Sequence, residues 1–333
     1  MIETVVHLFH IQMWNICSIS IGYTKSSKKS RGKRENLMEN ILETRSLTKK
    51  YGDKIAVNGM SLHVRRGDIY GLIGKNGAGK TSLMKLLLGL TTPDSGEMVL
   101  LGERNADHAR RRIGSLIEAP ALYKNETAFE NMKRFAILSP TSDTDIRNLL
   151  KLVGLDNTGA KKAGAFSLGM RQRLGIAIAL LGNPEVLILD EPINGLDPAG
   201  IKEIRDIILD LNRRGVAFLI SSHLLDELGK IATNYGIVSG GVLVEEITAE
   251  ALSAKCRTSL KLTTDNSKGT LAVLKRDFAG LTAEQDGKTV RITSPVSDPS
   301  EVNAALVKAG IRVYEMANES MGFEDFFIER LGR

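Results

Sequence analysis

The amino-acid sequence predicts an α/β fold built on a mainly parallel sheet that is covered by helices. Short apolar runs typical of buried strands occur at Ile69–Gly74, Glu185–Asp190 and residues 216–222. Amphipathic helical patterns follow the first two runs, at residues 81–90 and 201–215. Parallel strands need a crossover connection, which is usually a helix, so this alternation favours a parallel sheet over hairpins.

The other elements of the main domain are predicted in chain order from Met38. Residues 41–52 and 56–68 have the pattern of short antiparallel strands with turns, at one edge of the domain, and residues 97–103 that of a further strand. From about Leu122 onward the pattern is mostly helical, with polar interruptions. We therefore expect a helical subdomain at about residues 119–182.

The sequence pattern changes after about Glu246. Strand patterns and helical patterns then alternate in short pieces, with strands at residues 259–265, 289–294 and 311–317 and helices at residues 301–310 and 324–331. This predicts a main domain at residues 38–247 and a small accessory α+β domain at residues 248–333. The accessory part carries no recognisable chemical motif, and either a dimer-stabilising or regulatory role or a plain packing extension fits it.

Charge and cysteine content exclude some classes of protein. The chain of 333 residues has a net charge of +6, but residues 1–37 alone carry +4. The remainder is close to neutral, which argues against a nucleic-acid binder. Cys17 and Cys256 are the two cysteines of the chain, and they lie too far apart in sequence to suggest a metal motif.

The first 37 residues form a separate segment. Residues 4–24 are uncharged and moderately apolar, and a basic run follows them. A signal peptide would begin with positive charge, whereas this segment begins with Glu3. Our hypothesis is that translation starts at Met38 and that residues 1–37 are upstream sequence or a disordered extension; a membrane anchor is the alternative. Mass spectrometry of the native protein distinguishes these cases.

A phosphate-binding motif lies between the first buried strand and its helix. The sequence GKNGAGKT matches G-x-x-x-x-G-K-[ST], with the strand before it and the helix after it that the motif requires. Glycines let backbone N–H groups surround phosphate oxygens, Lys80 supplies a cation, and the Thr81 hydroxyl suits Mg²⁺. The candidate phosphate-binding residues are Gly74, Asn76, Gly77, Ala78, Gly79, Lys80, Thr81 and Ser82.

Two carboxylates, Asp190 and Glu191, end the second buried strand. In a parallel sheet, ligands bind at the carboxyl ends of the strands, so both side chains should face the phosphates. We expect Asp190 to hold Mg²⁺ through water and Glu191 to polarise the attacking water. Such a pair also caps helices, but its place downstream of a phosphate loop favours catalysis.

A second helix start, SLGMRQ at Ser167–Gln172, resembles the signature motif of the ATP-binding subunits of ABC transporters. In that family two subunits pair head to tail, and the signature helix of one caps the ATP bound by the other. The resemblance covers most of residues 41–247 and implies a P-loop NTPase core. It assigns Ser167 and Gly169 to a nucleotide in the facing subunit. Taken alone, the segment also fits a buried helix for which Ser167 is only the N-cap.

The resemblance implies further site residues. Tyr51 matches an aromatic that stacks on adenine, Asp197 closes the loop that crosses the dimer interface, and His223 matches the switch histidine that contacts the γ-phosphate. Glu118 takes the hinge position where the family usually has Gln. A carboxylate there can ligate Mg²⁺ or order water, but it adds negative charge beside Asp190 and Glu191.

Together these features predict an ATPase, with ATP and Mg²⁺ as cofactors, that drives a separate membrane permease. Residues 38–333 contain no apolar segment long enough to span a bilayer. The expected partners are a second ATP-binding subunit and the permease, at the cytoplasmic face of the membrane, with no nucleic acid. With Leu168, Met170 and Glu118 at these positions, the sequence resembles the branch of ABC ATPases that exports, or gives immunity to, bacitracin and lantibiotics. Another exported cargo or a non-transport ABC ATPase is the alternative.

Overall fold

The computed structural model describes residues 40–139, 141–256, 258–278, 280–294, 296, 298–320 and 323–331. The predicted extension at residues 1–37 lies outside these ranges. The chain forms two compact units that divide between Thr248 and Ala249, whereas the sequence prediction placed the boundary after residue 247.

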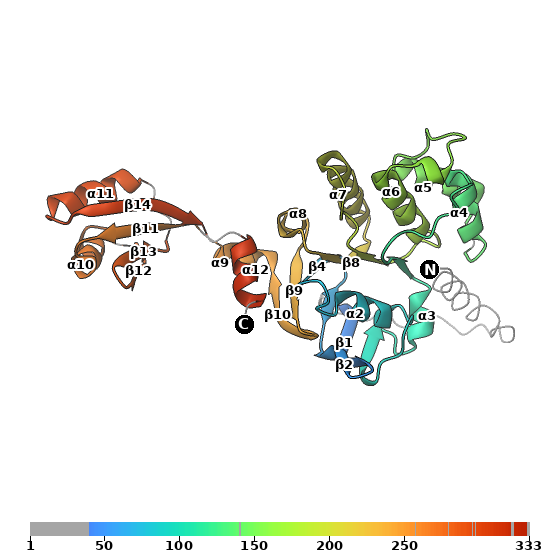
Figure 1. Ribbon diagram of the computed structural model, residues 1–333, viewed down its shortest axis with the longest axis horizontal. Helices are drawn as coiled ribbons and strands as arrows, with labels where there is room; N and C mark the ends of the chain where they lie inside the picture. The colour runs from blue at the N-terminus through green and yellow to red at the C-terminus, as the bar shows by residue number, and fades with distance from the viewer. Residues whose placement is uncertain are drawn as a thin grey trace, which may run out of the picture. The chain divides into compact units, whose positions relative to one another are not determined.

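The first unit is organised around a six-stranded, mainly parallel sheet (Figure 1). Its strands, in spatial order, are β10 (Val242–Thr248), β9 (Asn234–Ser239), β4 (Ile69–Ile73), β8 (Ala217–Ser222), β7 (Val186–Asp190) and β6 (Ile113–Leu116). Only β10 runs antiparallel to its neighbour among these strands. Every residue of β4, β7 and β8 is buried, as expected for strands covered on both faces. The predicted α/β fold with a mainly parallel sheet is therefore confirmed.

An antiparallel sheet packs beside the parallel one. Its strands are β2 (Lys54–Met60), β1 (Asn40–Tyr51), β3 (His63–Arg65) and β5 (Ser95–Leu100), with β1 paired to all three others. Helix α2 (Lys80–Leu87) contributes its buried leucines to the hydrophobic core that these strands share with β4, β7 and β8. This packing fixes the N-terminus of α2 at the end of β4.

Helices cover the rest of this unit. They are α3 (Ala106–Arg110), α4 (Ala128–Ala136), α5 (Asp143–Leu152), the 3-10 turn η1 (Ala163–Ala165), α6 (Leu168–Ala179), α7 (Pro198–Arg213) and α8 (Leu225–Gly229). Helices α4 and α5 each begin with a capping box, Thr127 with Glu130 and Ser142 with Asp145. These helices, with α6, occupy the predicted helical segment.

Helix α6 and strand β6 approach each other closely through two glycines. A Cβ atom on Gly114 of β6 would lie 2.0 Å from the carbonyl oxygen of Ala179. A Cβ on Gly175 of α6 would lie 2.9 Å from the side chains of Leu116 and Pro120. Only glycine fits at Gly114, where the neighbour is backbone, whereas a side chain at Gly175 would force its neighbours to shift, so both positions affect how α6 lies on the sheet.

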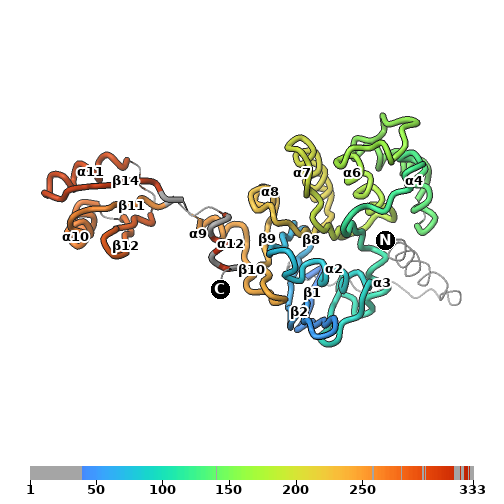
Figure 2. The backbone as a smooth tube through the Cα atoms, viewed as in Figure 1, coloured from blue at the N-terminus to red at the C-terminus, as the bar shows by residue number. Residues whose placement is uncertain are grey.

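The second unit contains a four-stranded antiparallel sheet with two helices packed on its apolar face. Its elements are α9 (Ala249–Lys255), β11 (Thr258–Thr264), α10 (Ser267–Asp277), β12 (Ala283–Asp286), β13 (Thr289–Ile292), α11 (Pro299–Lys308), β14 (Val313–Ser320) and α12 (Phe323–Leu331). The strand order is β12-β13-β11-β14, and Figure 2 follows the backbone through this β-α-β-β-α-β succession in orange and red. Leu262 and Val290 of the sheet share one core with Leu274 and Leu306 of the helices.

Candidate functional site

The candidate site forms where three neighbouring parallel strands end. In the register of the sheet, Ile73 at the end of β4 pairs with Ser222 of β8, and Asp190 at the end of β7 pairs with Ser221. The phosphate loop, the two carboxylates and His223 therefore leave the sheet at the same edge. This is the edge at which α/β proteins bind ligands.

The phosphate loop needs its glycines for steric reasons. Gly79, which precedes α2, has φ of 108°, and a Cβ there would lie 2.3 Å from the carbonyl oxygen of Ala56. A Cβ on Gly74 would lie 2.4 Å from the carbonyl oxygen of Val238. The backbone therefore curls tightly at the start of α2, where free N–H groups and the helix dipole favour an anion.

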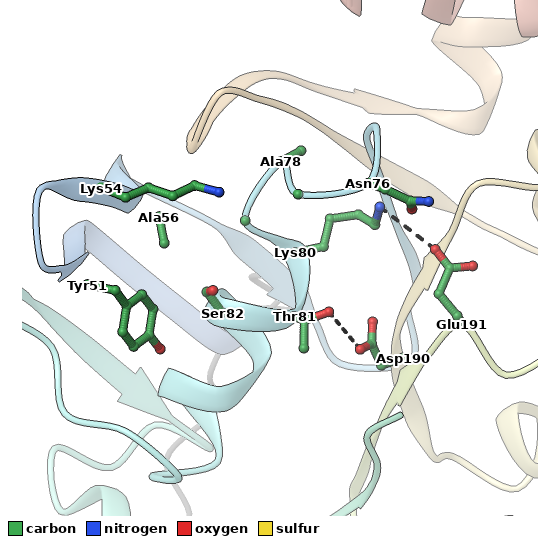
Figure 3. Close-up of a pocket in the computed structure, with 12 residues that line it drawn as sticks. Tyr51, Lys54, Ala56, Asn76, Ala78, Lys80, Thr81, Ser82, Asp190 and Glu191 are labelled. Atoms are coloured by element: carbon green, nitrogen blue, oxygen red, sulfur yellow. Dashed lines mark hydrogen bonds and ion pairs between the residues drawn. The ribbon is translucent and has the colours of Figure 1, made fainter. Parts of the chain in front are cut away.

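Lys80 lies inside this loop and is buried. Its Nζ donates a hydrogen bond to the carbonyl oxygen of Gly74 at 2.6 Å and lies 3.8 Å from Oε1 of Glu191 (Figure 3). A buried ammonium that faces one carboxylate and two backbone carbonyls, those of Gly74 and Lys75, is a strong local source of positive potential, because burial weakens solvent screening.

A chain of hydrogen bonds connects the loop to the end of β7 and β8. Thr81 donates from Oγ1 to Oδ2 of Asp190 at 2.7 Å, and Ser221 donates from Oγ to Oδ1 of the same carboxylate at 2.5 Å. The N–H of Glu191 donates in turn to Ser221 Oγ at 2.9 Å. Both oxygens of the buried Asp190 carboxylate thus have a partner, which fixes its orientation.

Glu191 is held by its backbone and by His223. Its φ of 49° lies in the left-handed region, which a non-glycine residue adopts only when its surroundings impose it. Its Oε2 lies 2.8 Å from Nδ1 of His223, whereas Oε1 is buried and accepts no hydrogen bond in the described part of the protein. This oxygen faces the Lys80 ammonium and is the available acceptor for a water or ligand proton.

A cavity of about 250 Å³ opens above the loop. Figure 3 places Tyr51 and Lys54 at one end and the two carboxylates at the other. The residues that line it are Tyr51, Lys54, Ala56, Asn76, Gly77, Ala78, Gly79, Lys80, Thr81, Ser82, Asp190 and Glu191. One end is thus aromatic and half-exposed, with the Lys54 cation beside it, and the other end carries the two carboxylates.

Several predicted residues do not line this cavity within the single chain. Ser167 caps α6 by accepting the N–H of Met170 at 3.2 Å, and Asp197 caps α7 by accepting the N–H of Gly200 at 3.1 Å. Gly169 follows in the first turn of α6. A Cβ at that position would have only Leu196 in ordinary contact, so the surface there is open.

Glu118 also lies outside the cavity lining. Its carboxylate contacts the ammonium of Lys85 on α2 at 2.9 Å and is largely exposed to solvent. That Glu118 ligates a metal stays a prediction; the partner that the structure gives its carboxylate is Lys85.

Sequence reasoning missed two polar residues of this region. Lys54 lines the cavity, and Ser221 connects Asp190 to Glu191, yet neither belongs to the motifs that were recognised. The signal for Ser221 was present, because polar residues that end a buried strand lie at the ligand-binding edge. Lys54 carries no comparable local signal, since only the packing of β2 beside the loop brings it there.

The polar groups fit a Mg²⁺ ion that a nucleotide carries with it. In the described parts of the chain, no cluster of three His, Cys, Asp or Glu side chains could hold a metal alone. The chain offers the Thr81 hydroxyl and the Asp190 carboxylate side by side. Mg²⁺ is commonly bound by one or two protein oxygens together with substrate phosphates and water, so this donor set suffices only with a nucleotide present.

Comparison with known proteins agrees with this geometry. The sequence model of the family described as ABC transporter matches residues 57–194. The bacitracin transport ATP-binding protein BcrA of Bacillus licheniformis is 40% identical over 302 residues, covering 89% of this chain and 98% of that protein. The lantibiotic transport ATP-binding protein SrtF of Streptococcus pyogenes is 43% identical over 206 residues, covering 62% of this chain and 90% of its own length.

The fold of the first unit is also similar to that of a solved ATP-binding cassette. The crystal structure of a nucleotide-free ATP-binding cassette from an ABC transporter aligns with a TM-score of 0.59 and 25% identity, covering 65% of this chain and 96% of that one. The fold and the loop with its two carboxylates define a nucleotide-hydrolysing cassette. The chain belongs to the ATP-binding subunits of ABC transporters, which bind and hydrolyse ATP.

Proposed function

We propose that this subunit powers export of, or immunity to, a peptide antibiotic of the bacitracin or lantibiotic kind, through a separate membrane permease. The observation that carries the proposal is the likeness to BcrA along 98% of that protein's length, which takes in the C-terminal unit as well as the cassette. In the described ranges, no helix is both long and apolar enough to cross a bilayer. Binding to a permease at the cytoplasmic face of the membrane would bring the chain to its place of action.

The geometry supports a specific division of labour in hydrolysis. The loop N–H groups and the buried Lys80 bind the β- and γ-phosphates, and Tyr51 stacks on the adenine at the other end of the cavity. Thr81 and Asp190 would hold Mg²⁺, which would neutralise charge on the phosphates. Glu191 accepts a proton from the attacking water through its free oxygen, while His223 holds the other oxygen in place.

We further propose that a second copy of the subunit completes each site. Three predicted residues lie outside the cavity of their own chain: Ser167, Gly169 and Asp197. The open surface at Gly169 leaves room for a phosphate group of the nucleotide that a facing subunit binds. The N-terminus of α6 is suited to an anion by its unpaired N–H groups. ATP would then close the two subunits, and hydrolysis would let them separate.

The experiment that tests the cargo is drug susceptibility. A susceptible bacterium would express this chain with the membrane gene beside it, against bacitracin, a lantibiotic and an unrelated drug. Resistance to one peptide antibiotic that Glu191→Gln abolishes supports the proposal. The matched control is Glu284→Gln, at an exposed position on β12, which should retain resistance. If expressed, ATP-hydrolysing protein gives no resistance, the cargo lies outside this class of antibiotics.

A further inference from the structure

The position of Glu118 follows from the register of the sheet. Leu116, the last residue of β6, pairs with Leu189 of β7, and Asp190 follows Leu189 directly. Glu118 therefore leaves the sheet at the same edge as Asp190 and Glu191. A third carboxylate beside these two would raise the local negative charge where a nucleotide with several phosphate charges must bind.

Glu118 is instead engaged by a cation on the helix of the phosphate loop. Lys85 lies four residues after Thr81 on α2, so the two side chains share one face of the helix, about one turn apart. The Lys85 ammonium lies 2.9 Å from Oε1 of Glu118. The two opposite charges neutralise each other outside the cavity lining, and the carboxylate is held toward the helix.

The backbone at Glu118 is also specific. Its φ is 61°, a left-handed conformation that residues other than glycine seldom adopt without support from their surroundings. Lys85 is the one side chain for which the described structure gives a bond or ion pair with this carboxylate. The ion pair is thus the recorded contact that orients the side chain of this residue.

We propose that Lys85 is the positioning residue for Glu118. Its ammonium tethers the carboxylate to α2, which keeps it from moving beside Asp190 until the nucleotide and Mg²⁺ are bound. Without the ion pair, the Glu118 carboxylate would be free to act as a metal ligand beside Asp190 before the nucleotide binds. The inference rests on the proposed nucleotide chemistry of this site, but it concerns only residues of this chain.

The test is a double-mutant cycle on the purified full-length chain with Lys85→Met, Glu118→Gln and the double variant. The readout is the Mg²⁺ concentration that half-saturates binding of fluorescent N-methylanthraniloyl-ATP, followed by kcat and KM for ATP. Lys85→Met should lower the half-saturating Mg²⁺ concentration by about threefold or more when Glu118 is present, because a freed carboxylate adds a metal donor. In the Glu118→Gln background the same change should have no such effect.

The cycle separates positioning from simple charge. Lys85→Met removes one positive charge in both backgrounds, so a purely electrostatic role gives equal shifts, and that additive result would overturn the proposal. Lys85→Arg should restore wild-type behaviour. Lys133→Met, which breaks the exposed pair with Asp143, is the matched control and should leave Mg²⁺ dependence unchanged.

Failure of the Lys85 proposal can be told apart from failure of the proposed function. If wild-type protein neither binds the fluorescent nucleotide nor hydrolyses ATP, the nucleotide site itself is wrong. If it does both but confers no drug resistance, only the cargo is wrong, and the cycle still tests Lys85. Circular dichroism of each variant verifies folding, and Lys85→Gln replaces Lys85→Met if the latter does not fold.

Discussion

Thr81 and Asp190 lie 109 residues apart in the sequence, yet the hydroxyl of one donates a 2.7 Å hydrogen bond to the carboxylate of the other. This bond joins the phosphate loop to the end of β7. It holds side by side the two protein oxygens to which we assign Mg²⁺ in the proposed function. The bond thus couples the position of the loop to that of the strand end.

Ser221 should prove necessary for this arrangement. Its hydroxyl connects Asp190 Oδ1 with the N–H of Glu191, so Ser221→Ala leaves a buried carboxylate oxygen without this partner, while the Glu191 N–H keeps its bond to the Ser221 carbonyl oxygen. We expect a loss of about 1–3 kcal/mol in the free energy of unfolding and a clear fall in kcat. Urea denaturation and a steady-state ATPase assay measure the two effects.

Ser222→Ala is the matched control for that change. Ser222 is equally buried, but its hydroxyl accepts the N–H of Leu224 and lies away from the Asp190 hydrogen bonds. Its loss should lower stability without a comparable fall in kcat. If both variants lose activity equally, the connection through Ser221 is not specific to the carboxylates.

Lys54 should contribute to nucleotide affinity. It lines the cavity next to Tyr51, and Figure 3 shows its side chain extending toward the phosphate loop near Ala78. Lys54→Gln should weaken ATP binding by about threefold to tenfold and AMP binding less, because the loss depends on phosphate charge. Isothermal titration with ATP, ADP and AMP measures this trend, and Lys54→Arg should retain affinity. An equal loss for all three nucleotides would place its contact away from the phosphates.

Tyr70 should make stability depend on pH in the alkaline range. Burial, together with the nearby Glu246 carboxylate, raises the pKa of its hydroxyl well above 10.0. Because the folded-state pKa exceeds the unfolded one, its contribution to stability is complete below pH 10 and is lost as pH rises further. The free energy of unfolding should fall by at most about 1.4 kcal/mol per pH unit from this group.

Urea denaturation between pH 9 and 11 measures that slope. Tyr70→Phe removes the group that titrates, so its free energy of unfolding should fall less steeply with pH than that of wild type. At neutral pH the variant should be less stable, because it lacks the 2.6 Å hydrogen bond from Tyr70 to Glu246. Tyr51→Phe, at a half-exposed tyrosine, is the control and should follow the wild-type slope. Identical slopes for wild type and Tyr70→Phe would contradict the assignment.

The sequence allowed the chemical centre of the site to be predicted because its residues carry local signals. Lys80 and Thr81 stand in a fixed pattern between a strand and a helix, and Asp190 and Glu191 directly follow a buried strand. Such signals depend on neighbours in the chain. The α/β fold could be predicted for the same reason, since its central strands are short apolar runs.

Elements and contacts set by tertiary pairing could not be predicted in this way. Strand β6 has only four residues, and one of them is Gly114, a residue type with low strand propensity. The strand forms because it pairs with β7. Helix α10 contains Gly269 near its start, which weakened its helical pattern. The pairing of Lys85 with Glu118 depends on two elements that meet only in the folded unit.

The most direct test of the account is the nucleotide state of Glu191→Gln. With its general base removed, hydrolysis should slow by about two to four orders of magnitude while ATP still binds. Light scattering coupled to size-exclusion chromatography, with quantification of bound nucleotide, should then find a dimer that retains two ATP molecules with Mg²⁺. A variant that hydrolyses ATP at the wild-type rate, or that stays monomeric at saturating ATP, would contradict the roles of Glu191 and of the facing subunit.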